Sequence, residues 1–151
     1  MERDDEAAVR RFRRDVTEHR SVGRVHVEFR RLKSSPGEYT DSVATAFVKG
    51  LALHAPTAWT KLDPRDALQA ATRVLQLDLA YKAPVMTNDI ATSLALRFFE
   101  LCGEGAAYLT NGSLALTGTG AWSPLTDATF DAGIVGVTST RVGLLWVEDE
   151  G

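Results

Sequence analysis

Hydrophobic and polar residues alternate along the chain in two ways, with helical spacing first and strand-like spacing later. Val9, Phe12 and Val16 recur at helical spacing among charged residues, which predicts an amphipathic surface helix over residues 2–19. Apolar and polar residues then alternate strictly over 24–32. This second pattern predicts a strand with one buried and one solvent-facing side.

Three further helices are predicted in the middle of the chain. The first covers 41–54, and the second covers 64–79 with Asp63 as its N-cap and a proline at its first position. The third covers 88–102 and ends before Gly103. Because the last two are apolar over about half their circumference, we expect them to be the main cover of the core.

The last third of the sequence is typical of antiparallel strands. Asn111-Gly112 is the dipeptide of a type I′ turn, so residues 107–117 are predicted to form a hairpin. A second hairpin is expected from 128–137 and 141–147. The order of helix, strand, three helices and four strands predicts an α+β fold with an N-terminal helix and strand, a three-helix middle and C-terminal antiparallel hairpins in a mainly antiparallel sheet.

Composition limits the class of protein. The chain has 151 residues, of which 44% are hydrophobic and 25% charged, so we expect residues 1–151 to form a single globular domain. Its single cysteine, Cys102, excludes an intramolecular disulfide. We also expect a cytoplasmic protein, because no apolar run is long enough to span a membrane and the N-terminal residues are too charged for a signal peptide.

The net charge of −3 hides a gradient along the chain. Residues 1–33 carry +3, residues 34–100 carry −1 and residues 101–151 carry −5. The total argues against a broad nucleic-acid-binding surface, though not against a local basic patch. We expect neither direct contact with nucleic acid nor a membrane partner. The acidic last third either keeps the protein soluble or attracts a basic partner.

Motifs for common catalytic and cofactor sites are absent from the sequence. The three histidines lack metal-binding spacing, no G-x-S-x-G or P-loop occurs, and the glycines after position 117 do not complete a dinucleotide fingerprint. We therefore predict neither a metal nor a cofactor. One enzyme alternative stays open, in which the carboxylates of Asp127/Asp131 and Glu148/Asp149 on neighbouring strands act as acid and base.

Aromatic residues in the same region favour a binding function instead. Exposed aromatic side chains serve as centres of interfaces, and acids around them attract a basic partner. The predicted contact residues are Tyr108, Trp122, Asp127, Asp131, Glu148 and Asp149. A third hypothesis is a self-associating accessory domain, which predicts an apolar patch around the helices at 64–80 and 88–102.

The end of the chain resembles that of small bacterial immunity proteins, the inhibitors encoded beside secreted polymorphic toxins. The resemblance lies in residues 129–137 (TFDAGIVGV) and 141–150 (RVGLLWVEDE), about the last 25 residues. It implies a cytosolic protein without catalysis that occludes the active site of a cognate toxin. Many such toxins are nucleases or deaminases with basic active-site surfaces, which an acidic inhibitor patch would suit.

Overall fold

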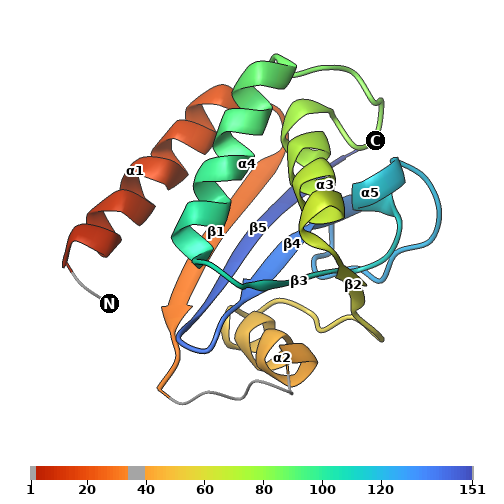
Figure 1. Cartoon of the computed structure of the whole chain (residues 1–151). Coiled ribbons are helices and arrows are strands. Elements are labelled where there is room, and N and C mark those ends of the chain that lie inside the picture. Colours follow the sequence, from red (N-terminus) through yellow and green to blue (C-terminus); the bar gives the residue numbers. More distant parts are fainter. Residues whose placement is uncertain (1–2, 34–39, 151) are drawn as a thin grey trace.

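A computed structural model of the chain describes residues 3–33 and 40–150 and contains one antiparallel sheet with helices on both faces (Figure 1). The five strands are hydrogen-bonded in the order β1-β5-β4-β3-β2. The elements are α1 (Arg3–His19), β1 (Arg24–Arg31), α2 (Thr40–Gly50), β2 (Thr60–Leu62), α3 (Pro64–Gln76), α4 (Asn88–Cys102), β3 (Ala107–Thr110), α5 (Leu114–Thr117), β4 (Phe130–Val137) and β5 (Arg141–Asp149). The predicted α+β class is confirmed.

Helices cover the two faces of the sheet unequally. Side chains alternate between the faces of a strand, so Ile134 of β4 and Leu145 of β5 pack with α1, α3 and α4. Val135 and Leu144 belong to a second cluster with α2 and the segments around it. Both faces of β4 and β5 are therefore buried, which explains why these strands are nearly continuous apolar runs.

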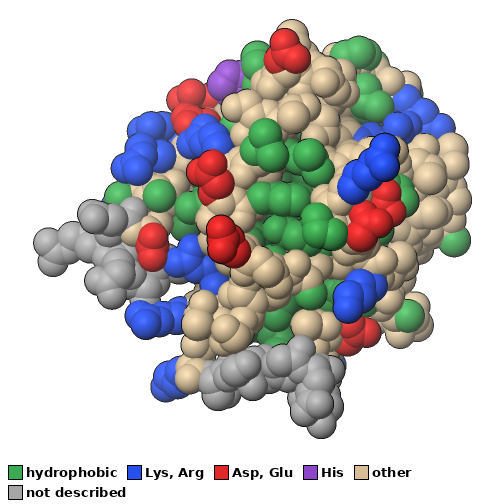
Figure 2. Space-filling model, in the orientation of Figure 1, with side chains coloured by type: hydrophobic (Ala, Val, Ile, Leu, Met, Phe, Trp, Pro, Cys, Tyr) green, Lys and Arg blue, Asp and Glu red, His purple; other side chains and the backbone are tan. Residues whose placement is uncertain are grey.

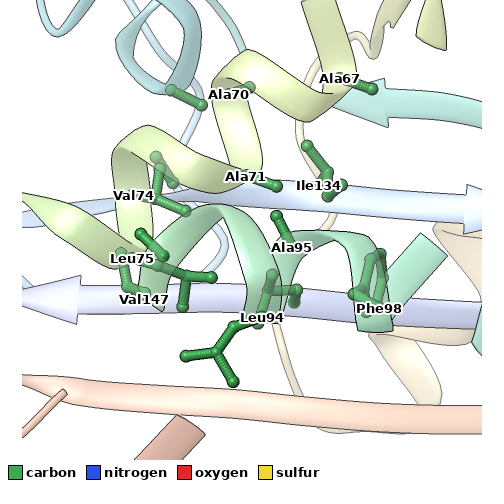
Figure 3. Packing of buried hydrophobic residues seen from close by; sticks show 14 of the residues in the cluster. Ala67, Ala70, Ala71, Val74, Leu75, Leu94, Ala95, Phe98, Ile134 and Val147 are labelled. Carbon is green, nitrogen blue, oxygen red and sulfur yellow. The ribbon is translucent and has the colours of Figure 1, made fainter. Parts of the chain in front are cut away.

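The predicted role of α3 and α4 as the main cover of the core is confirmed, and Figure 3 shows how they pack on the sheet. Asp63 caps α3 by accepting a hydrogen bond from the N–H of Asp66 at 2.8 Å. Small side chains on α3 let it approach both α4 and the strands closely. The labelled contacts are Ala67, Ala70, Ala71, Val74 and Leu75 of α3 with Leu94, Ala95 and Phe98 of α4 and Ile134 and Val147 of the sheet.

Two predicted helix ends differ from the structure, and the start predicted at residue 2 lies outside the described residues. The helix predicted over 41–54 ends at Gly50, because Ala52 has a φ of +62° and the N–H of His54 donates to the backbone oxygen of Leu125. The helix predicted over 64–79 ends at Gln76, because the backbone becomes extended at Leu77.

The predicted hairpin over 107–117 is wrong, whereas the second hairpin, between β4 and β5, is confirmed. A type I′ turn needs positive φ at both central residues, and Asn111 is not among the residues with positive φ. Residues 114–117 form the short helix α5, and β3 pairs with β4 and with β2, a three-residue strand that the sequence pattern did not indicate.

No helix among the described residues combines the length and apolarity needed to cross a membrane.

Candidate functional site

A buried carboxylate holds the loop over residues 118–129, which joins α5 to β4. Asp131 in β4 is fully buried and accepts hydrogen bonds from the backbone N–H groups of Leu125 (3.1 Å) and Thr126 (3.0 Å). The hydroxyl of Thr126 donates a third bond at 2.9 Å. Burying a charge is costly unless it is fully hydrogen-bonded, so these bonds both stabilise Asp131 and fix the course of the loop.

The same carboxylate connects the loop to the centre of the sheet. The indole Nε1 of Trp146 in β5 donates to Asp131 at 3.0 Å, and the side-chain amide of Asn111 donates at 3.3 Å. Asn111 also donates to the backbone oxygen of Ser123 in the loop, at 2.8 Å. The prediction that Asp131 belongs to an exposed acidic patch is therefore wrong. Its carboxylate is buried and accepts its hydrogen bonds from groups inside the protein.

Asp149 is also buried, in an ion pair with Arg20. Arg20 donates two hydrogen bonds to this carboxylate, at 3.0 and 2.7 Å, and the N–H of Leu79 adds a third at 2.8 Å. The guanidinium of Arg20 also donates to the backbone oxygens of Val22, Val74 and Leu77. Asp149 is therefore not available to a partner either. Its prediction as a contact residue is wrong for the same reason as that of Asp131.

The four carboxylates of the enzyme hypothesis do not converge. Asp131 lies opposite Glu148 across the β4–β5 ladder, so these two side chains point to the same face. Asp149 is next to Glu148 in the strand and points to the other face. Asp131 and Asp149 are thus buried on opposite faces of the sheet, and the carboxylate of each is already hydrogen-bonded within the protein. This arrangement does not bring an acid and a base to one substrate.

Tyr108 is separated from the other predicted contact residues. Its ring is buried and stacked on Phe99, with the ring centroids 4.4 Å apart. Burial raises the pKa of its phenol above the usual range, and the neighbouring Cys102 adds to this shift. Tyr108 lies in β3 against α4, whereas the loop residues lie at the other end of that strand.

Trp122 and Asp127 are the two predicted residues that share an accessible surface. The indole of Trp122 is half-buried and stacks on Phe130, with the ring centroids 5.6 Å apart. Both residues line a hollow of about 460 Å³, here called the Trp122 surface. Its lining residues are Ala121, Trp122, Pro124, Thr126, Asp127, Ala128 and Thr129.

Two histidine–carboxylate pairs hold the remaining acids. The side chain of Asp127 is 97% exposed, and its carboxylate lies 2.8 Å from Nε2 of His54. Glu148 is partly buried and bonds Nε2 of His26 on β1. Glu148 therefore faces β1 and does not line the Trp122 surface, so the predicted patch narrows to Trp122 and Asp127.

Reasoning from sequence missed the residues that position this surface. Asn111 acts on residues 12 and 20 positions away, whereas Thr126 bonds Asp131 five positions further along the chain. The partner of the other buried acid, Arg20, was missed as well, because it is 129 positions from Asp149. One local signal existed: Asp131 and Asp149 each lie at the end of a strand that is buried on both faces. An acid in such a place must be paired or hydrogen-bonded.

Cys102 is predicted to be chemically inert in the folded protein. It is buried at the end of α4, and this burial raises the pKa of its thiol above the usual range, although Arg141 opposes the shift. The thiolate is the reactive form, so we expect the native protein to react with an aromatic disulfide reagent at least about 100-fold more slowly than the urea-unfolded chain. A rapid reaction of the native thiol would contradict the buried placement.

Neither a metal site in the described part of the chain nor a similarity to known proteins was found. Among residues 3–33 and 40–150, no group of three or more His, Cys, Asp or Glu side chains is arranged to hold a metal ion. No protein-family model, curated protein or solved structure matches the chain.

Proposed function

We propose that this chain is a non-catalytic binding protein of the bacterial immunity type. In this proposal it works in the cytoplasm, where it inhibits a cognate toxin enzyme by covering the active site. The toxin presents a basic surface to it, and the inhibitor makes no direct contact with nucleic acid. The contact surface is the Trp122 surface, and no cofactor takes part.

The observation that carries the proposal is the rigid support of an irregular loop. Five groups donate hydrogen bonds to one buried carboxylate, Asp131, and three of these donors belong to Leu125 and Thr126 in the loop. Binding loses affinity when a loop must be ordered first. A loop already fixed by the core presents Trp122 and Asp127 in one geometry before the partner arrives.

The chemistry of the Trp122 surface suits a basic partner. Tryptophan is enriched among the residues that dominate binding energy, and here its indole is supported from beneath by Phe130. The carboxylate beside it, that of Asp127, is almost fully exposed. Exposed charges at an interface mainly raise the association rate with an oppositely charged partner.

The product of the adjoining reading frame is the partner with which to test the proposal. We expect this product to arrest growth when expressed alone and to be neutralised by co-expression of the present chain. Trp122→Ala is expected to weaken binding by about 30-fold or more, as for a central aromatic anchor. Asp127→Asn is expected to slow association several-fold and to reduce its dependence on salt.

Glu18→Gln is the matched control, since Glu18 is an exposed acid on α1, away from the loop. It should leave affinity and association rate unchanged. The proposal fails if the adjoining product neither binds nor is neutralised. The assignment of the surface fails if binding occurs but Trp122→Ala and Glu18→Gln behave alike.

A further inference from the structure

An apolar hollow lies at the C-terminal end of α4, separate from the Trp122 surface. Figure 2 shows hydrophobic side chains gathered in the centre of the face that α3 and α4 form. The hollow has a volume of about 630 Å³. Its apolar walls come from Pro64 at the start of α3, Leu96 and Phe99 of α4, and Ala106 and Tyr108 at the start of β3.

Leu96 is the clearest unpartnered apolar group in this hollow, here called the α4 hollow. Its side chain is on the outer surface of α4 and the residue is 46% exposed. Beneath it, Phe99 stacks on Tyr108 and closes the floor. A large apolar side chain on an apolar floor is typical of an interaction surface.

The charge at the rim of the α4 hollow is negative, although Glu100 also borders a neighbouring hollow that Arg31 and Arg141 line. Glu100 and Glu104 both line it, and no Lys or Arg is among the described lining residues. These acids stand at the C-terminal end of a 15-residue helix that has no basic residue in its last turn. The helix dipole is negative at this end and favours a cation there. Arg141 donates to the oxygen of Leu101 nearby, but its guanidinium is also paired with Asp5.

We infer that the α4 hollow binds a segment of another protein in which an apolar side chain is flanked by Lys or Arg. The apolar group would cover Leu96 and Phe99, and the cations would meet Glu100, Glu104 and the negative end of α4. A two-fold contact with a second copy is disfavoured, because it would place like charges opposite each other. This inference does not depend on the proposed function, since the α4 hollow and the Trp122 surface share no lining residue.

Two synthetic peptides test the inference against the full-length, ¹⁵N-labelled chain. One peptide has two leucines flanked on each side by two lysines, and the other has glutamates in place of the lysines. We expect the lysine peptide to shift the amide resonances of Leu96, Phe99 and Ala106. The glutamate peptide is expected to bind at least about tenfold more weakly.

Substitutions separate the apolar from the ionic part of the site. Leu96→Gln is expected to lower the affinity for the lysine peptide by about tenfold. Glu100→Gln is expected to lower this affinity by about tenfold at low salt but not at high salt. Tyr81→Gln is the matched control, because Tyr81 is 72% exposed but does not line the α4 hollow. All three positions are at the surface, so an unchanged circular dichroism spectrum verifies the fold of each variant.

Three results would overturn the inference. The first is an absence of shifts around Leu96 at millimolar lysine peptide, and the second is equal binding of the two peptides. The third is a dimer in sedimentation experiments that Leu96→Gln dissociates, which would assign the α4 hollow to self-association.

Discussion

Arg20→Ala is expected to lower the free energy of unfolding by about 3 to 5 kcal/mol, because it leaves the carboxylate of Asp149 buried without its countercharge. Both side chains of this pair are completely inaccessible to solvent. The substitution also removes the donors to three backbone oxygens, in α3, just after α3 and just before β1. Urea unfolding followed by circular dichroism measures the change. For a domain of this size, the loss is a large part of the total stability.

An exposed ion pair on the same molecule provides the control. Arg13 and Glu28 are 3.7 Å apart, and their side chains are 41% and 42% exposed. Glu28→Gln should therefore cost less than about 1 kcal/mol. The double variant Arg20→Met/Asp149→Leu should recover part of the loss, since no unpaired charge is then buried. If Arg20→Ala costs no more than Glu28→Gln, the pair is not buried in solution.

Local patterns predicted those parts of the fold that local contacts stabilise. The start of α3 follows from Asp63 and the proline after it, because the cap and the helix are neighbours in sequence. The β4–β5 hairpin likewise follows from two apolar strands with a short connection. In both cases the interactions that determine the structure lie within a few residues of each other.

Asn111-Gly112 shows where local reasoning fails. The dipeptide strongly favours a tight turn, yet the amide of Asn111 is used to hold Ser123 and Asp131, 12 and 20 residues away. A buried carboxylate gains more from an additional donor than the chain gains from a turn that water could solvate. The long-range demand therefore overrides the local preference.

The charge count along the sequence needs the same correction. Two of the six acids in the last third, Asp131 and Asp149, are buried, and Asp149 is neutralised by an arginine from the N-terminal third. The accessible acidity is smaller than −5 and is divided between separate places. Asp127 lies on the Trp122 surface, while Glu104 lies at the α4 hollow. A charge sum over a stretch of sequence therefore counts together acids, such as Asp127 and Glu104, that lie on separate surfaces of the folded protein.

Asp131→Ala is expected to have the second large effect, a loss of about 3 to 5 kcal/mol in the free energy of unfolding. It leaves the buried donors of Trp146, Asn111, Leu125 and Thr126 without their shared acceptor, and each unsatisfied donor costs about 1 to 3 kcal/mol before relaxation. Water can reach some of these groups once the loop moves, so the costs do not add fully. Urea unfolding measures the total loss.

Hydrogen exchange shows where the loss occurs and separates Asp131→Ala from Arg20→Ala. If Asp131 fixes the loop, the amides of Leu125 and Thr126 should lose protection beyond the change in global stability, whereas Arg20→Ala should lower their protection only through global unfolding. Thr126→Val removes one donor to Asp131 and the acceptor of the Ala128 N–H but keeps the carboxylate, so it should cost only about 1 to 2 kcal/mol. Equal protection of the two amides in both destabilised variants would mean that the loop is held by its own packing. The Trp122 surface would then owe its geometry to the stacking of Trp122 on Phe130, with Asp131 serving only to stabilise the sheet.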